Sequence, residues 1–173
     1  PFFVLAGELM NRSGITGRLV DFAKFFLGRV RGGLSQVSVA TSLIFAGLSG
    51  SSTAETAAIG KTIGSTMVKE GYDKNFVGGL VAASGTLALV IPPSIIMITY
   101  GSMMNVSIGD LFTAGIVPGI IMALALMIVS YIVAVKKGHP KSTEKMTWKG
   151  FIDVLIGAAL AFVMPIIIIF GIR

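Results

Sequence analysis

Residues 45 to 55 read FAGLSGSSTAE, a run of small and hydroxyl-bearing residues in a chain otherwise rich in Ile, Leu, Val and Met. The run ends with a carboxylate, Glu55. Three interpretations compete for it: a serine nucleophile, a face of small residues for close helix packing, or backbone that lines a binding site. The sequence on either side of the run discriminates between them.

The composition is typical of a membrane protein. Of the 173 residues, 54% are hydrophobic and 13% are charged, and the mean hydropathy is +0.88, whereas soluble domains are about 25% charged. The net charge of +6 would suit nucleic acid or anionic lipid. However, the basic residues lie in short turns between apolar segments, which argues against nucleic-acid binding. The absence of cysteine excludes disulfides and thiolate metal sites within the chain.

Three uncharged runs are long enough to cross a membrane: 75–106, 111–135 and 154–172. A helix needs about 20 residues to span about 30 Å of hydrocarbon. Residues 32–54 are also uncharged, but their apolar part, 34–48, would form a helix of only about 22 Å at about 1.5 Å per residue. A second short helix is expected over about 53–68. Neither of these two helices is long enough to cross.

The distribution of basic residues favours a re-entrant hairpin over residues 34–70. Lys and Arg precede this segment, occur within and after it, and fill the loop at 136–149, whereas residues 101–115 have none. If the segment enters and leaves by the same face, every Lys and Arg except Arg173 lies on that face. The positive-inside rule makes that face cytoplasmic. A single crossing would instead place the two flanking basic clusters on opposite sides of the membrane.

The segment before the hairpin is amphipathic. Residues 15–30, ITGRLVDFAKFFLGRV, place apolar side chains along one helical face: Ile15, Leu19, Phe22, Phe26 and Val30. Charged side chains occupy much of the other face: Arg18, Asp21, Lys24 and Arg29. This pattern predicts a helix that lies in the cytoplasmic membrane interface, and a soluble surface helix is the alternative.

The tip of a re-entrant hairpin is non-helical backbone, which a membrane tolerates only where it is buried in protein or lines a wet cavity. Gly47 and Gly50 allow a tight turn, and Ser52 with Glu55 fits the S-x-x-E capping box that would start the second helix. Free carbonyls at the end of the first helix and nearby hydroxyls suit Na⁺, whereas free amides suit an anion. Close helix packing by small residues and a direct functional role for Glu55 remain alternatives.

A second interruption is predicted within SGTLALVIPPSI, residues 84–95. Pro92 and Pro93 have no amide hydrogens, so the carbonyls four residues earlier lose their helical partners. Helical backbone angles are unfavourable for Ile91 because a proline follows it. The span should break into two half-helices near the bilayer middle, and a simple proline kink is the alternative. Two further residues are expected close to the break: Gly85 and Thr86.

The stretch Gly47-Leu48-Ser49-Gly50 matches the G-x-S-G pattern of intramembrane serine proteases. A serine nucleophile needs an activating base, usually histidine. The one histidine of the sequence, His139, lies between the second and third long runs, in a basic loop beside Pro140. We therefore predict that the protein is not an enzyme.

Four stretches, in this order and spacing, resemble the large membrane subunit of tripartite ATP-independent periplasmic (TRAP) transporters: PFFVLAGELMNRSGITGRLVDFAK (1–24), FAGLSGSSTAETAAIG (45–60), VAASGTLALVIPPSIIMITYG (81–101) and VSIGDLFTAGIVPGI (106–120). The resemblance covers residues 1 to about 135, and residues 151–172 look like the next helix of the family. It implies an all-α, polytopic protein of the bacterial inner membrane. The implied function is elevator-type, Na⁺-driven import of an organic anion such as a C4-dicarboxylate or a sialic acid.

The resemblance also implies partners and site residues. The partners are a periplasmic substrate-binding protein and a small membrane subunit, with no cofactor beyond the coupling Na⁺. The residues implied to bind substrate or Na⁺ are Ser49, Gly50, Ser51, Ser52 and Thr53 at the tip, and Gly85, Thr86, Pro92, Pro93 and Ser94 at the break. The chain departs from the family at Glu55, where Asp is usual, and at Ala88-Leu89, where Gly-Pro is usual. A channel with a re-entrant pore loop and a non-transporting scaffold are the alternatives.

The predicted organisation is one half of a transport unit. The chain begins at Pro1 without a signal sequence, and neither interruption is repeated later in it, so we expect an internal piece that holds the first of two inverted repeats. Its predicted segments are the end of a preceding transmembrane helix (1–11), an amphipathic interfacial arm helix (12–33), the re-entrant hairpin (34–70), a discontinuous transmembrane helix (75–106), a transmembrane helix (107–136), a cytoplasmic loop (137–150) and a transmembrane helix that begins the second half (151–173).

The hairpin hypothesis predicts the side of the membrane on which two positions lie. Single cysteines would be introduced as Lys69→Cys and Asn105→Cys into a cysteine-free form of the complete protein, and intact cells treated with a membrane-impermeant maleimide. We expect labelling at position 105 and protection at position 69, because a hairpin returns the chain to the cytoplasmic side. Labelling of position 69 from outside would mean that residues 34–58 cross the membrane.

Overall fold

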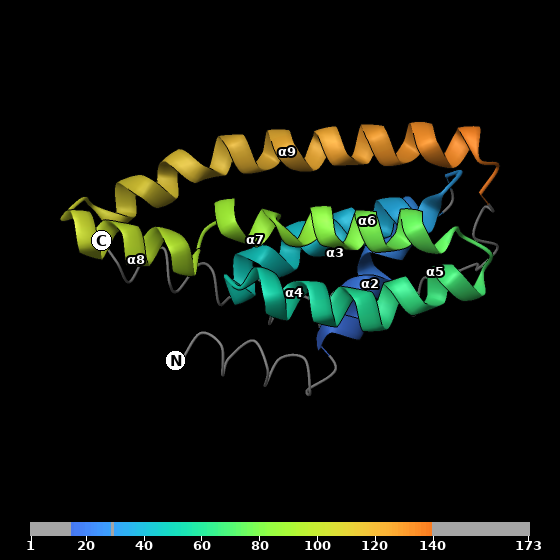
Figure 1. Ribbon diagram of the computed structural model, residues 1–173, viewed down its shortest axis with the longest axis horizontal. Coiled ribbons are helices and arrows are strands. Elements are labelled where there is room, and N and C mark those ends of the chain that lie inside the picture. Colours follow the sequence, from blue (N-terminus) through green and yellow to red (C-terminus); the bar gives the residue numbers. More distant parts are fainter. Residues whose placement is uncertain (1–14, 29, 140–173) are drawn as a thin grey trace.

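The computed structural model describes residues 15–28 and 30–139, which form helices joined by short connections (Figure 1). The segments predicted at 1–11 and 151–173, and the loop beyond residue 139, lie outside the described residues. The elements in chain order are α2 (Ile15–Leu27), α3 (Gly33–Ser49), α4 (Ser52–Ile59), the π-helical segment η1 (Gly60–Gly64), α5 (Ser65–Lys69), α6 (Lys74–Gly85), α7 (Leu87–Val90), α8 (Ile95–Met104) and α9 (Ile108–Lys136).

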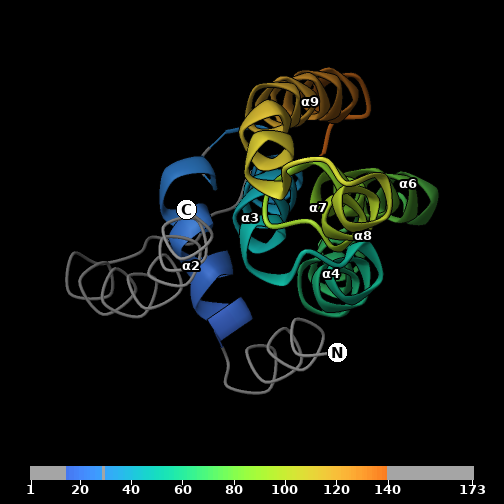
Figure 2. The same ribbon diagram turned by 90° about the vertical axis from the view of Figure 1, so that its left-hand side faces the viewer.

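Helix α3 lies at the centre of these elements. Seen end-on, α2 flanks it on one side and α6 to α8 on the other, while α9 and α4 cover the remaining sides (Figure 2). Most of its residues are buried. Its apolar side chains, including Leu34 and Val37, join side chains of η1 and α6 such as Ile63 and Val81 in one hydrophobic cluster. The core is therefore organised around a helix that is itself too short to cross a bilayer.

Glycines and a short acidic side chain set several helix ends. α3 follows Gly32 and precedes Gly50, whose φ angles are 64° and 58°, a conformation that glycine adopts at little cost. α6 begins after Asp73, whose carboxylate accepts a hydrogen bond from the Phe76 amide at 2.8 Å, as an N-cap residue does. These boundaries are local in origin and follow from residue type.

The hairpin has two arms, α3 on one side and the continuous run α4–η1–α5 on the other. The start of α3, the end of α5, the start of α6 and the end of α9 all gather at one end of the described body (Figure 1). The connection between α3 and α4 lies toward the opposite end, near the connection between α7 and α8. The chain therefore enters and leaves the hairpin at the same end of the molecule.

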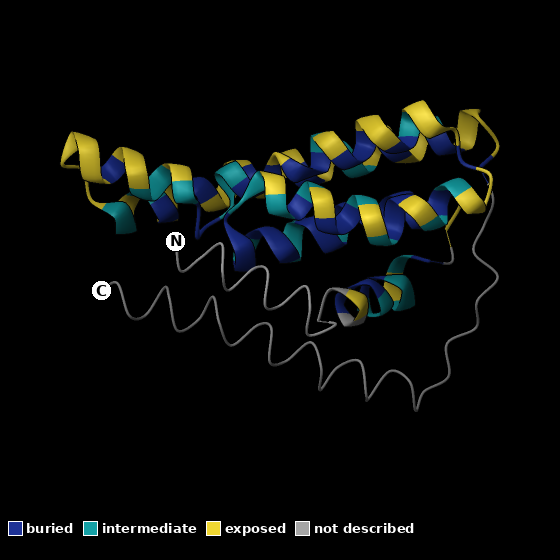
Figure 3. Ribbon diagram, turned by 60° about the horizontal axis from the view of Figure 1, so that its bottom comes forward, coloured by how far each residue is buried: buried dark blue, intermediate teal, exposed yellow. Residues whose placement is uncertain are grey.

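Two helical runs among the described residues are long and apolar enough to span a membrane. They are Lys74–Met104, with 31 residues, and α9, with 29 residues. Exposed residues lie on the outsides of the helical runs and buried ones between them (Figure 3). Only a few residues of α9 are buried, so its outer side is largely exposed. Large apolar side chains cover that side, for example Val117, Ile121 and Ile128, at 60% exposure or more. Such a surface fits contact with lipid, and the described part of the chain is an all-helical body with two long apolar helices.

Only part of the apolar face of α2 is buried against the rest of the body. Leu19, Val20 and Ala23 are buried against the rest of the body, whereas Phe26, predicted on the same face as Leu19, is 59% exposed. The reason lies in the packing against α3, where the small Ala23 allows close approach. The bulky Phe26 is left on the outer side, where it forms an edge-to-face pair with Phe22, at 5.2 Å between ring centroids.

A buried hydrogen-bond network joins α3 to α9. The side-chain amide of Gln36 donates to the Met127 carbonyl oxygen at 3.0 Å and to the Ser130 hydroxyl at 2.9 Å. The Ser130 hydroxyl in turn donates to the same carbonyl at 3.0 Å. Gln36 is 5% exposed. An amide buried at this depth would be costly without partners, so the network fixes the position of α9 along α3.

Replacing Gln36 should loosen the α3–α9 contact. In the complete protein we expect Gln36→Leu to lower the free energy of unfolding by about 1 kcal/mol, because a buried hydrogen bond between membrane helices contributes about that much. Thermal unfolding of the purified protein measures the change. The control is Thr113→Val, which removes an exposed hydroxyl bonded only within α9. Equal unfolding temperatures for the wild type and Gln36→Leu would contradict the prediction.

Candidate functional site

The connection between α3 and α4 is a tight turn of two residues. Gly50 is left-handed, and its amide donates to the Ala46 carbonyl at 3.2 Å. Ser51 is extended, and its hydroxyl accepts from the Ala54 amide at 3.4 Å as the N-cap of α4. The Ser51 hydroxyl also lies 3.2 Å from that of Thr53. The tip therefore gathers the carbonyl end of α3, the amide end of α4 and several hydroxyl groups.

The start of α4 corrects the predicted capping box. The N-cap is Ser51, and Ser52 is the first helical residue. Because Gly50 turns the chain in the left-handed conformation, the extended residue falls one position earlier than predicted. Glu55 then cannot occupy the reciprocal capping position. Its side chain is fully buried, and neither carboxylate oxygen has a hydrogen-bond partner among the described residues.

The run from α6 to α8 is interrupted around the two prolines. α7 ends at Val90, Ile91 is extended with ψ at 126°, and α8 begins after Ser94. The Ser94 hydroxyl donates to the Leu89 carbonyl at 2.8 Å, one of the carbonyls that a proline leaves without a helical amide. Ser94 also serves as the N-cap of α8, accepting from the Met97 amide at 3.4 Å. One buried serine thus satisfies both sides of the break.

The tip and the break are in direct contact. The Ile95 amide, at the start of α8, donates to the Gly50 carbonyl at 3.2 Å. A Cβ atom at Gly50 would overlap the carbonyl oxygen of Pro93, whereas one at Gly47 would lie at an ordinary 3.6 Å from that of Pro92. The two glycines therefore differ: Gly50 is required by close approach as well as by its φ angle, and Gly47 is not.

The remaining predicted residues lie around this contact. Gly85 packs against α4, where a Cβ would overlap the Thr56 hydroxyl and lie 3.5 Å from the Ser52 carbonyl oxygen. Thr86 is exposed, and its hydroxyl donates to the Ala83 carbonyl at 2.6 Å. The structure thus brings Gly50, Pro93 and Ser94 to the contact of tip and break, and Gly85 to the side of α4. The Thr86 side chain is directed to its own helix.

Two glycines of α9 complete the support of the break and were not singled out in the sequence. A Cβ at Gly115 would overlap the side chain of Met97 and approach the Val90 carbonyl, and one at Gly119 would overlap the Ile91 side chain. Their spacing, G-x-x-x-G, is the pattern that lets membrane helices approach closely. That spacing is the feature of the sequence from which the two glycines could have been identified.

The described residues offer no catalytic arrangement. They contain no group of three or more His, Cys, Asp or Glu side chains able to hold a metal ion. His139 follows the end of α9, where its ring packs on those of Tyr72 and Phe76 at 4.4 and 5.1 Å between centroids. The hairpin tip lies toward the other end of the body (Figure 1). Ser49 therefore has no histidine base within the described residues.

Comparison with known sequences identifies relatives of the whole chain. Residues 1–173 match the family described as "Tripartite ATP-independent periplasmic transporter, DctM component". The chain is 41% identical over 175 residues to the sialic acid TRAP transporter large permease protein of Vibrio cholerae, a match covering 99% of the chain and 40% of that relative.

Two further relatives are named for different substrates. The C4-dicarboxylate TRAP transporter large permease protein of Pseudomonas aeruginosa is 46% identical over 140 residues, 81% of the chain and 33% of the relative. The 2,3-diketo-L-gulonate TRAP transporter large permease protein of Escherichia coli is 40% identical over 176 residues, 100% of the chain and 40% of the relative. The chain spans two fifths or less of the length of these three relatives.

The contact between tip and break predicts different effects of the same substitution at two nearby glycines. In the complete protein we expect Gly50→Ala to lower the free energy of unfolding by about 2 kcal/mol or more, because a left-handed alanine alone costs about 1–2 kcal/mol and its methyl group would overlap the Pro93 carbonyl oxygen. Thermal unfolding is again the measurement.

Gly47→Ala is the matched control for this change. Its methyl group makes an ordinary contact, and alanine is favoured over glycine inside a helix by about 1 kcal/mol. We expect no loss of stability from it. An equal loss from the two substitutions would contradict the proposed close approach at Gly50.

Proposed function

The chain belongs to the DctM family of tripartite ATP-independent periplasmic transporter permeases, and on this premise we propose that it forms the hairpin-and-broken-helix half of a Na⁺-coupled importer of an organic anion. The family is one of membrane transporters and not of enzymes. The proposed location is the bacterial inner membrane, with a periplasmic substrate-binding protein and a small membrane subunit as partners.

The relatives support an organic anion as the class of substrate. They are named for sialic acid, C4-dicarboxylate and 2,3-diketo-L-gulonate, which are all carboxylates, and for isethionate, which is a sulfonate. The shared chemistry is a small, polar molecule with one or more negative groups. We therefore propose a substrate with a C4-dicarboxylate-like or sialic-acid-like anionic group.

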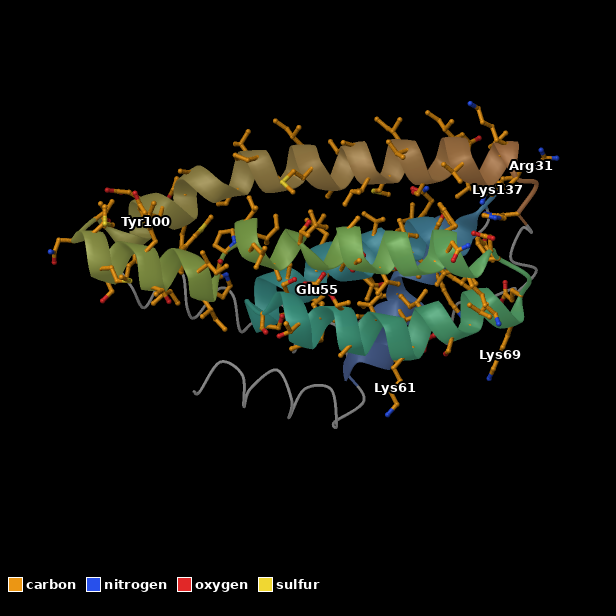
Figure 4. All side chains as sticks on the ribbon, in the orientation of Figure 1. Arg31, Glu55, Lys61, Lys69, Tyr100 and Lys137 are labelled. Carbon is orange, nitrogen blue, oxygen red and sulfur yellow. The ribbon has the colours of Figure 1, made fainter. Side chains whose placement is uncertain are left out.

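The positions of basic side chains support a re-entrant hairpin at residues 34–70. Figure 4 shows Arg31, Lys69 and Lys137 at one end of the body, where the chain enters and leaves the hairpin, and Tyr100 toward the other. With that end cytoplasmic, the hairpin follows the positive-inside rule. The tip then lies within the membrane beside the interruption of the long run Lys74–Met104, which supports a discontinuous transmembrane helix.

The chemistry of the contact between tip and break carries the proposal. The carbonyl end of α3 has partial negative charge, and the amide end of α4 has partial positive charge. Ser49, Ser51, Ser52 and Thr53 add hydroxyl groups. Discontinuous helices in secondary transporters use such ends to coordinate Na⁺ and to bind anionic substrate groups. We propose that Ser49 to Thr53 at the tip, with Gly85, Thr86, Pro92, Pro93 and Ser94 at and near the break, line the Na⁺ and substrate sites.

The arrangement of α2 and α9 supports an elevator-type movement of this unit. α2 packs on the hairpin through one face and exposes Phe26 on another, as an interfacial arm helix would. α9 contacts the break through two glycines and exposes large apolar side chains on its outer side. The hairpin and the broken helix can then move together as one packed unit.

Uptake by the complete transporter tests the proposal. In proteoliposomes that hold both membrane subunits, with the binding protein and a radiolabelled C4-dicarboxylate or sialic acid outside, we expect saturable uptake that is lost when K⁺ replaces Na⁺. Flux that survives the replacement would instead support a channel.

Variants at the tip test the assignment of site residues. We expect Ser51→Ala to reduce uptake about tenfold or more, because it removes a tip hydroxyl and a cap contributing about 1 kcal/mol. Ser65→Ala, the same change on α5 away from the tip, should leave uptake unchanged. Normal uptake by Ser51→Ala, and by Ser52→Ala, would favour a non-transporting scaffold role for the tip.

A further inference from the structure

Four buried polar residues occur on the two arms of the hairpin, three on α3 and one on α4. On α3, three hydroxyl-bearing residues follow the spacing i, i+3, i+4, which places them on one face of the helix. The four residues are Ser38, Thr41 and Ser42 on α3 with Glu55 on α4, and we call them the inner polar cluster. All four residues are fully buried. Figure 4 shows Glu55 in the interior of the body.

None of the side-chain oxygens of this cluster has a hydrogen-bond partner among the described residues. The Ser42 hydroxyl lies beside the Glu55 carboxylate, but the two do not meet in hydrogen-bond geometry. Other hydroxyls within helices of this chain behave differently. Thr62 donates to the Ala58 carbonyl at 2.7 Å, and Thr99 donates to the carbonyl four residues before it at 2.9 Å. The hydroxyls of the cluster do not turn back to their own helix in this way.

A buried carboxylate without hydrogen bonds or an opposite charge is strongly unfavourable. No basic side chain among those that the structure places is recorded as acting on the Glu55 carboxyl group. Lys61, on the same helical run, is exposed and extends away from the body, and Arg31, Lys69 and Lys137 lie at its far end (Figure 4). An ionisable side chain at membrane depth generally marks a site for an ion or a substrate. The charge of Glu55 therefore calls for a partner that is not part of the described chain.

The chemistry of the cluster favours a small hard cation over a proton. A proton would let the Glu55 carboxyl group donate to one hydroxyl oxygen, and would leave the other hydroxyl oxygens unpaired. A cation such as Na⁺ accepts lone pairs from hydroxyl and carboxylate oxygens together. Glu55 also lies in the first turn of α4, where the helix dipole favours the ionised carboxylate. A single carboxylate with neutral oxygens matches the charge of a monovalent cation.

We propose that Glu55 and Ser42, with Thr41 and Ser38 on the same face of α3, form a Na⁺ site inside the hairpin, separate from the site at the tip. This inference deepens the proposed Na⁺ coupling and rests on it for the choice of ion. The site joins the two arms α3 and α4 across their interface, whereas the tip site joins the hairpin to the broken helix. An ion here would hold the arms together and connect Na⁺ binding to the shape of the hairpin.

Na⁺ binding to the purified complete permease tests the proposal without transport. Equilibrium binding of ²²Na⁺ counts the ions bound per permease. We expect Glu55→Gln, which keeps the size of the side chain but removes its charge, to lose one bound Na⁺. We expect Ser42→Ala, which keeps the carboxylate, to weaken Na⁺ binding at this site about tenfold. Glu70→Gln is the matched control, because it makes the same chemical change on an exposed residue of the same hairpin, and it should bind as many ions as the wild type.

The tip variant Ser51→Ala separates the two sites, since it should keep the ion held by Glu55. An unchanged number of Na⁺ ions in Glu55→Gln would overturn the proposal and indicate that the carboxyl group carries a proton. If Glu55→Gln cannot be purified, Ser42→Ala tests the proposal in its place. Unaltered Na⁺ affinity in that variant would equally overturn the proposed site.

The uptake assay distinguishes failure of this inference from failure of the proposed function. Uptake that needs Na⁺, together with unaltered Na⁺ binding in Glu55→Gln, would reject the inner site and leave the proposed coupling intact. Uptake that does not need Na⁺, together with loss of one ion in Glu55→Gln, would reject the coupling and support the inner site.

Discussion

The hydrogen bond from the Ile95 amide to the Gly50 carbonyl joins two interruptions of helical structure that lie far apart in the sequence. Backbone groups at an interruption inside a membrane need partners from elsewhere in the protein. The turn at Gly50 and the break at the two prolines provide a hydrogen-bond partner for each other. Within the break, the Ser94 hydroxyl donates a hydrogen bond to the Leu89 carbonyl. The rest of the fold holds these two segments in contact, and α9 does so through Gly115 and Gly119.

The centre of the fold is unusual for a membrane protein because α3 carries many polar residues. Gln36 finds its partners on α9, and Ser35 donates to the Gly32 carbonyl at 2.6 Å. The side chains of the inner polar cluster have neither a hydrogen-bond partner on another helix nor one on their own helix among the described residues. Buried polar groups that are fully bonded stabilise one arrangement of helices, whereas unbonded ones create a need for a ligand. The same helix therefore has a structural end near Gln36 and, closer to the tip, a face suited to ion binding.

This division agrees with the role proposed for the hairpin. A transport site must bind and release its ions, so its oxygens cannot all be engaged within the protein. The Gln36 network and the glycine contacts of α9 involve no hydroxyl of the tip. The scaffold of the site and its candidate ligands thus belong to different residues, which allows the packing to persist while the ligands change partners.

The sequence by itself determined the features that depend on local chemistry. The length of the apolar runs predicted the two long apolar helices, and Pro92 and Pro93 predicted where Ile91 leaves the helix. Gly50 predicted the turn after α3. Only the tertiary structure decided the features that depend on contacts between distant segments. These are the outward position of Phe26, the shift of the N-cap from Ser52 to Ser51, the different requirements at Gly47 and Gly50, and the burial of Glu55 against α3. Residue type and spacing set the conformation of each segment, but which side chain becomes buried or unpaired depends on the neighbour that packs against it.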